Sequence, residues 1–138
     1  MNNSPVFIVD SDAEDKELIE TAWKDSALDN KLYFFSNAED VIRELETGTV
    51  VPFLIISEID LPKISGLQLK QYLLQHKSTN FKSIPFVFFT DMPSQAQIEQ
   101  AYHLCTNGLF KKPDSFNKLK QLLIDIVNYW RESIVPLN

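Results

Sequence analysis

The stretch Pro52–Gly66 reads P-F-L-I-I-S-E-I-D-L-P-K-I-S-G. Its unbroken apolar run, Phe53–Ile56, is typical of a strand that is buried on both faces of a parallel sheet. The acidic residues Glu58 and Asp60 follow the run, and a proline and a glycine then end the strand and open a loop. Open α/β sheets carry their chemistry at the carboxyl ends of parallel strands, so both carboxylates lie where a functional site is expected.

The composition is that of one globular domain. At 138 residues and 44% apolar content, the chain can form a single buried core, which we place at about residues 6–130 of a domain spanning 1–138. A net charge of −6 argues against a nucleic-acid-binding surface, which needs clustered Lys and Arg. With the single cysteine Cys105, the absence of a signal peptide and no apolar run approaching the roughly 20 residues of a membrane helix, we expect a cytoplasmic protein.

Strands and helices are predicted to alternate five times along the chain. The other strand candidates are Val6–Val9, Lys31–Phe35, Phe86–Phe89 and Leu109–Lys112. Apolar residues at helical spacing follow each strand, with Asn37 and Ser94 as expected N-caps and Gly48 as a helix stop. We expect residues 81–85 to be a plain connection to the fourth strand. This alternation predicts a parallel sheet with helices on both faces and no second, output domain.

Four chemically distinct residues fall at the carboxyl ends of four different strands. They are Asp10, Glu58, Thr90 and Lys112. Taken singly, three of them have an ordinary explanation: Asp10 as a helix cap, Thr90 as a hydroxyl at the edge of the core and Lys112 as a solvated charge. Because parallel strands present these ends along a common edge, however, the four side chains are expected to converge on one site.

The segment S-E-I-D-L-P-K-I-S-G resembles the phosphoacceptor segment of bacterial response-regulator receiver domains, whose usual form is Asp-x-x-x-Pro-x-x-x-Gly. Pro62 and Gly66 keep that spacing, and Glu58 stands at the place of the acceptor aspartate. The Thr after the fourth strand and the Lys-Pro after the fifth also match the family. The resemblance extends from Val6 to Trp130 and implies a three-layer, doubly wound α/β fold. Its five-stranded parallel sheet would have the flavodoxin-like strand order 2-1-3-4-5.

The resemblance also implies a Mg²⁺ site, which this sequence alters. The family's usual pair of acids after the first strand is here Asp10 followed by Ser11, and a neutral hydroxyl is a poor ligand for a hard cation. The remaining candidate ligands are Asp10, Glu58 and Asp60. We therefore expect weak Mg²⁺ binding and no cofactor at ordinary concentrations. Asp12 is expected to start the following helix rather than to bind metal.

Two further features of the family's phosphotransfer machinery differ. Glu58 is one methylene longer than aspartate, which moves its carboxylate by ~1.5 Å, and a displacement of about 1 Å can cost a hundredfold in rate. We expect Glu58 to contact Lys112 in the absence of phosphate. The resemblance also implies a cis Lys112–Pro113 peptide bond, whose bend would point the lysine ammonium at Glu58. Leu109 stands where the family has a switch aromatic, so the coupling between site and surface is expected to differ.

The leading interpretation is a single-domain receiver of two-component (phosphorelay) signal transduction that binds proteins without being phosphorylated, and is not an enzyme. Its partner, a sensor kinase or a downstream signalling protein, would bind the helix after Ser94, the strand Leu109–Lys112 and the last helix. We expect no nucleic-acid or membrane partner. The alternative is a phosphorylatable receiver that catalyses its own phosphotransfer and hydrolysis with Mg²⁺, with Asp60 as the acceptor.

Two other functions are disfavoured by the sequence. A flavin-binding protein of this fold would need a phosphate loop of Ser, Thr and Gly after the first strand. The acidic segment Asp10–Asp15 would instead repel a phosphate, so we reject this function. The two histidines, His76 and His103, fall in predicted helices away from the site edge, which favours a surface role over phosphorelay.

Overall fold

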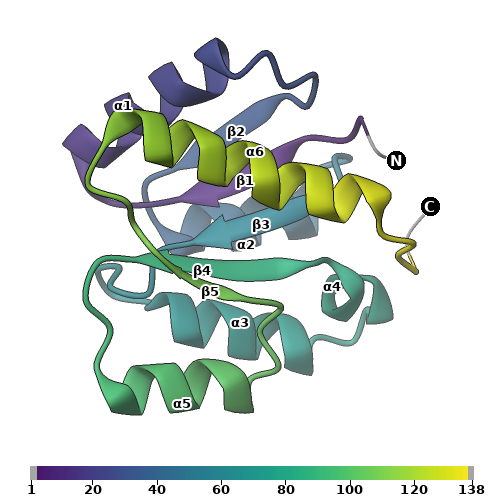
Figure 1. Cartoon of the computed structure of the whole chain (residues 1–138). Coiled ribbons are helices and arrows are strands. Elements are labelled where there is room, and N and C mark those ends of the chain that lie inside the picture. The colour runs from purple at the N-terminus through teal and green to yellow at the C-terminus, as the bar shows by residue number, and fades with distance from the viewer. Residues whose placement is uncertain (1–2, 137–138) are drawn as a thin grey trace.

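The computed structural model describes residues 3–136. Its centre is a five-stranded sheet in the order β2-β1-β3-β4-β5, in which every neighbouring pair is parallel (Figure 1). The strands are β1 (Val6–Val9), β2 (Leu32–Phe35), β3 (Leu54–Ser57), β4 (Phe86–Thr90) and β5 (Leu109–Lys111). The predicted fold class and strand order are therefore confirmed.

Helices cover both faces of this sheet and complete a three-layer arrangement (Figure 1). They are α1 (Ala13–Asp25), α2 (Ala38–Thr47), α3 (Gly66–Gln75), α4 (Thr79–Ser83), α5 (Gln95–His103) and α6 (Phe116–Glu132). Helices α1 and α6 pack with one face of the sheet, and α2, α3 and α5 pack with the other. The short α4 connects α3 to β4.

Two hydrophobic cores result, one on each side of the sheet. Strand β1 shows the division, because Val6 and Ile8 belong to the core beneath α1 and α6, whereas Phe7 and Val9 belong to the core beneath α2 and α3. All four residues are at most 1% exposed. A strand that is covered on both faces has no need of polar positions, which explains the continuous apolar runs in the sequence.

Most of the predicted helix boundaries are present, and the structure contains one helix, α4, that was not predicted. Asp12 caps α1 by accepting hydrogen bonds from Glu14 N and Asp15 N, and Asn37 and Ser94 cap α2 and α5. The expectation that residues 81–85 form a plain connection is wrong, because α4 occupies most of this segment. A five-residue helix is too short to show apolar periodicity, so the pattern could not reveal it.

Gly66 allows the first turn of α3 to approach the end of β3 closely. A Cβ atom at this position would lie 2.0 Å from the carbonyl oxygen of Glu58. Gly66→Ala should therefore lower the free energy of unfolding by about 1–3 kcal/mol, which urea denaturation would measure. Gly108→Ala is the control, since its added carbon would meet only side-chain atoms, the nearest being in the Phe110 ring at 2.9 Å. An equal loss in both variants would contradict this explanation.

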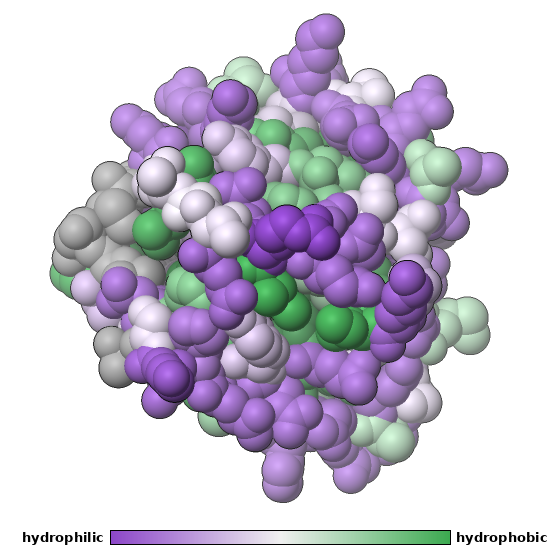
Figure 2. Space-filling model, turned by 180° about the vertical axis from the view of Figure 1, so that it is seen from behind, coloured by the Kyte–Doolittle hydropathy of each residue, from purple (hydrophilic) through white to green (hydrophobic). Residues whose placement is uncertain are grey.

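The side seen in Figure 2 is largely hydrophilic, with hydrophobic residues showing in a short central strip and in smaller patches around it. The exposed large apolar side chains include Met92, Tyr129 and Ile134. Among residues 3–136, none of the helices combines the length and the apolar composition that a membrane span requires.

Candidate functional site

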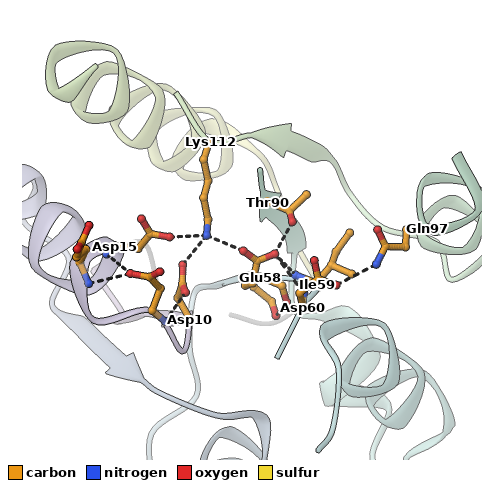
Figure 3. Close-up of polar contacts among 11 residues, drawn as sticks. Asp10, Asp15, Glu58, Ile59, Asp60, Thr90, Gln97 and Lys112 are labelled. Atoms are coloured by element: carbon orange, nitrogen blue, oxygen red, sulfur yellow. Dashed lines mark hydrogen bonds and ion pairs between the residues drawn. The ribbon is translucent and has the colours of Figure 1, made fainter. Parts of the chain in front are cut away.

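The four predicted residues come together at the carboxyl edge of the sheet (Figure 3). The strand pairings continue one residue beyond β3 and β5 and so hold two of them in place. Glu58 N donates to Val9 O at 3.0 Å, and Lys112 N donates to Thr90 O at 2.8 Å. Asp10 follows β1, and Thr90 is the last residue of β4. Asp10, Glu58 and Thr90 are all buried.

The Lys112 ammonium is the centre of the site. Its Nζ lies 2.8 Å from Asp10 Oδ2, 2.7 Å from Asp15 Oδ2 and 2.6 Å from Glu58 Oε1 (Figure 3). Only 8% of the Lys112 side chain is exposed. A lysine ammonium has three N–H donors, and three carboxylates surround this one, so the site holds one positive charge among three groups that are negative when ionised.

Both carboxylate oxygens of Glu58 are engaged. Oε1 accepts from Lys112, as predicted, while Oε2 accepts from the backbone N–H groups of Ile59 at 2.7 Å and Asp60 at 3.2 Å. The Thr90 hydroxyl also donates to Oε2. Glu58 is therefore held by four donors from three segments of the chain, and it is only 8% exposed.

Asp15 is a member of the site that the sequence did not reveal. In the sequence it stands only as the last acid of the segment Asp10–Asp15, yet its carboxylate contacts Lys112 from the first turn of α1. Its position five residues after Asp10 gave no signal, because the path between them depends on the Asp12 cap, which turns the chain into α1.

Asp60 lies apart from the other predicted metal ligands. Its Oδ1 accepts a hydrogen bond from Gln97 Nε2 at 3.0 Å, so its side chain faces α5 (Figure 3). Gln97 is itself fixed by a capping box with Ser94, and Ser11 is exposed. Within the described chain, no three or more His, Cys, Asp or Glu side chains form a group that could hold a metal ion.

The family model of the response regulator receiver domain matches residues 6–124, which include all of these site residues. The chain belongs to the response-regulator receiver family. Two curated relatives come from Methanothrix harundinacea (strain 6Ac). The probable methanogenesis regulatory protein FilR2 is 29% identical over 60% of this chain and 52% of its own length, and FilR1 is 25% identical over 92% and 28%. The match thus spans about half of FilR2 and a smaller part of FilR1.

Solved structures of response regulators share this fold. The phosphorylated cyanobacterial phytochrome response regulator RcpA has a TM-score of 0.84 at 21% identity, covering 97% of this chain and 99% of its own. The bacteriophytochrome response regulator AtBRR has a TM-score of 0.71 at 25% identity, covering 88% and 91%. These similarities agree with the receiver fold described above.

One prediction about the receiver site is wrong. Every peptide bond in the described part of the chain is trans, including Lys112–Pro113. Lys112 nevertheless reaches Glu58, because the backbone pairing of Lys112 with Thr90 already places it at the carboxyl edge. The long lysine side chain spans the remaining distance without a bend in the backbone.

The switch position and the histidines lie outside the site. Leu109 is half-buried and packs with the core beneath α2 and α3. His76 is the C-cap of α3, where its ring stacks on Phe81 and its Nε2 lies 3.3 Å from Glu46 Oε1. His103 ends α5. Neither histidine contacts Lys112 or Glu58.

Burial and the ion pairs shift two pKa values in this receiver site. Burial raises the pKa of Asp10 above its ordinary value of 3.8, even though Lys112 and the Asp12 N–H partly offset this effect. For Lys112, burial alone would lower the pKa, but hydrogen bonds to Asp10, Asp15 and Glu58 outweigh it and raise the pKa above 10.5. Lys112 therefore stabilises the fold below pH 10.5, and this contribution is lost only as the pH rises through the raised value.

Asp10 should give this receiver an unusual dependence of stability on pH. Because its folded pKa is raised, the folded state holds the Asp10 proton more tightly, so its contribution to stability falls as the pH rises from about 3.8 through the raised value. Asp10→Asn removes this titration. The free energy of unfolding of the variant, relative to the unaltered protein, should thus increase with pH across that window. Urea denaturation at a series of pH values from about 3.5 to about 7 would measure the difference, and an opposite slope would contradict the assignment.

Proposed function

We propose that this receiver domain works in two-component signalling as a protein-binding module that takes up no phosphoryl group at Glu58. The engagement of both Glu58 oxygens carries this proposal. An attacking carboxylate needs an oxygen free to approach phosphorus in line, but Oε1 is paired with Lys112 and Oε2 accepts three hydrogen bonds. Each hydrogen bond to a charged group is worth about 1.5–3 kcal/mol, so freeing the carboxylate is costly.

The same contacts favour one fixed signalling state. In a phosphorylated receiver, the hydroxyl after the fourth strand and the lysine after the fifth would hold the phosphoryl oxygens. Here Thr90 and Lys112 both hold the Glu58 carboxylate instead. Glu58 thus supplies a negative charge near the place that an aspartyl phosphate would occupy. We infer an active-like state that requires no kinase.

The surface for a protein partner is the one made by α5, β5 and α6. The site reaches α5 through the Asp60–Gln97 hydrogen bond and reaches β5 through Lys112. Leu109 stands at the position of the family's switch aromatic. The inferred state would therefore reach the partner surface through these backbone and side-chain contacts. The partner would be a sensor kinase or a downstream signalling protein. We further propose a cytoplasmic location, in keeping with the free, exposed Cys105.

The residues at this site do not fit the Mg²⁺ that the family implies. The Lys112 ammonium lies between Asp10 and Glu58, the two acids that would face the ion, and contacts both. Ser11 offers only a neutral oxygen, and Asp60 is bonded to Gln97. A divalent cation would have to displace a buried ammonium from its carboxylates, so we infer weak binding.

Calorimetric titration should therefore detect no submillimolar affinity for Mg²⁺ in the unaltered protein. Ser11→Asp should tighten binding by supplying a charged oxygen ligand. The control is Asn128→Asp, an exposed change far from the site. Asn37→Asp would not serve as a control, because Asn37 caps α2. Submillimolar affinity in the unaltered protein would count against the inference.

Intact-mass spectrometry tests the proposed function directly. The protein would be incubated with a small phosphodonor and Mg²⁺, and its mass should remain unchanged. An added phosphoryl group that disappears in Glu58→Gln would show that the acceptor is active. A group that persists in Glu58→Gln but is lost in Asp60→Asn would favour the alternative acceptor instead.

A further inference from the structure

Lys70 is a buried lysine that has no carboxylate partner. It lies in α3 and is only 3% exposed. Within residues 3–136 its side chain makes no hydrogen bond or ion pair, and its Nζ lies over the Phe86 ring, 5.4 Å from the centroid. A buried ammonium without a paired anion is costly. Burial accordingly lowers the pKa of Lys70 from its ordinary value of 10.5, so its amine is neutral more often than that of an exposed lysine.

Cys105 lies directly after the C-cap of α5 and is the single cysteine of the chain. Its N–H donates to Tyr102 O at 3.0 Å. Its φ of 60° is a left-handed conformation that glycine usually supplies at the end of a helix. The residue is exposed and its thiol is free. A thiol therefore stands open to small oxidants at a fixed position of the backbone.

Both residues lie beside the start of β4. The Lys70 ammonium faces the ring of Phe86, and Thr106, which follows Cys105, donates its hydroxyl to Phe86 O at 3.2 Å. Asn107 N donates to the same oxygen at 2.9 Å. Helices α3 and α5, which carry Lys70 and lead into Cys105, cover the same face of the sheet (Figure 1). The two side chains interact electrostatically, and this partly offsets the effect of burial on the pKa of Lys70.

We propose that Lys70 and Cys105 form a reversible covalent cross-link, in which Lys70 Nζ is bonded to Cys105 Sγ after hydrogen peroxide has oxidised the thiol. The sulfur first attacks an oxygen of the peroxide. The O–O bond breaks, water leaves, and a sulfenic acid remains, in which the sulfur has lost two electrons to the peroxide. The neutral Lys70 amine then attacks this sulfur. The S–O bond breaks, and the hydroxyl group leaves as water with a proton from the nitrogen, so no further oxidant is needed.

Small thiols reverse the reaction. One thiol attacks the cross-linked sulfur and releases the amine, and a second thiol reduces the mixed disulfide that is left on Cys105. While it exists, the bond ties the end of α5 to α3. None of the residues around Glu58 takes part, so the cross-link is independent of the proposed signalling function and of any phosphorylation.

Intact-mass spectrometry of the full chain tests the cross-link. After mild treatment with hydrogen peroxide, the monomer should lose the mass of two hydrogen atoms and should no longer react with a maleimide. Dithiothreitol should restore both properties. An intramolecular disulfide cannot produce this change, because the chain has no second cysteine. Proteolysis under non-reducing conditions should yield a product in which the peptides of Lys70 and Cys105 are joined.

Variants separate the amine of Lys70 from its charge. Cys105→Ser and Lys70→Met should both abolish the mass loss, and methionine suits the buried position. Lys70→Arg, which keeps the positive charge but offers no amine of this kind, should abolish it as well. Lys82→Met is the matched control, because Lys82 is an exposed lysine of α4, and this change should leave the cross-link intact.

Three results would overturn the proposal. In the first, the unaltered protein stays unchanged or only gains oxygen atoms. In the second, peroxide produces only dimers joined through Cys105. In the third, the loss of two hydrogen atoms persists in Lys70→Met or Lys70→Arg, which would show that Cys105 reacts without the Lys70 amine.

Discussion

Lys112→Met should destabilise the receiver domain by about 3–5 kcal/mol, the usual cost of removing one partner from a buried charge cluster. Methionine keeps much of the length of the side chain and its apolar packing, but it leaves Asp10, Asp15 and Glu58 without their shared cation. The three carboxylates would then repel one another in a poorly solvated site. Urea denaturation at neutral pH would measure the loss as a lower midpoint with an unchanged slope.

Lys120→Met is the matched control for this change. Lys120 pairs with Asp25 at 3.0 Å, but the two side chains are 29% and 58% exposed, so the loss should be only about 0–1 kcal/mol. Lowering the pH should reduce the penalty of Lys112→Met, because protonation removes the repulsion, beginning with Asp10, whose pKa burial raises. Equal losses in the two variants would show that the cluster contributes no more than an exposed pair.

The double change Glu58→Asp with Ser11→Asp should convert the protein into one that accepts a phosphoryl group. The shorter side chain withdraws the carboxylate by ~1.5 Å, which weakens its contacts with Lys112 and Thr90 and frees an oxygen for attack. The added aspartate restores a charged ligand for Mg²⁺. We expect the double variant to gain the mass of a phosphoryl group from a small phosphodonor under conditions in which the unaltered protein stays unlabelled, a difference in rate on the order of a hundredfold or more.

The single variants separate the two causes. Glu58→Asp alone should remain poorly labelled because its metal site is still defective, and Ser11→Asp alone should bind Mg²⁺ without phosphotransfer. Labelling would be followed by intact-mass spectrometry over time. If the unaltered protein were labelled as fast as the double variant, the ion pair and hydrogen bonds of Glu58 would not be what prevents phosphoryl transfer.

The sequence was sufficient to predict the sheet and the core of the site. Buried parallel strands require continuous apolar runs, and those runs placed Asp10, Glu58, Thr90 and Lys112 at one edge. The contact between Glu58 and Lys112 followed from the added methylene, and the structure confirms it at 2.6 Å. These features depend on strand ends, which the apolar pattern locates within a residue or two.

Features that depend on the paths of loops and side chains were not predicted. Asp15 reaches Lys112 only because the Asp12 cap sets where α1 begins relative to β1. Asp60 was expected near the acceptor, but Gln97, 37 positions later in the chain, provides a donor that holds it towards α5. Neither pairing produces a periodic pattern, and both depend on the relative placement of helices that a single sequence does not specify.

The ion cluster around Lys112 also has a consequence for the order of folding. Its contacts join positions 97 and 54 residues apart in the chain, Asp15 and Glu58 with Lys112. Contacts between such distant positions carry a large loop-closure cost and form once the intervening strands have assembled. The cluster should therefore be absent from the folding transition state. Loss of the lysine would then leave the refolding rate nearly unchanged and accelerate unfolding. The contacts of the ammonium would thus be the last to form during folding and the first to break during unfolding.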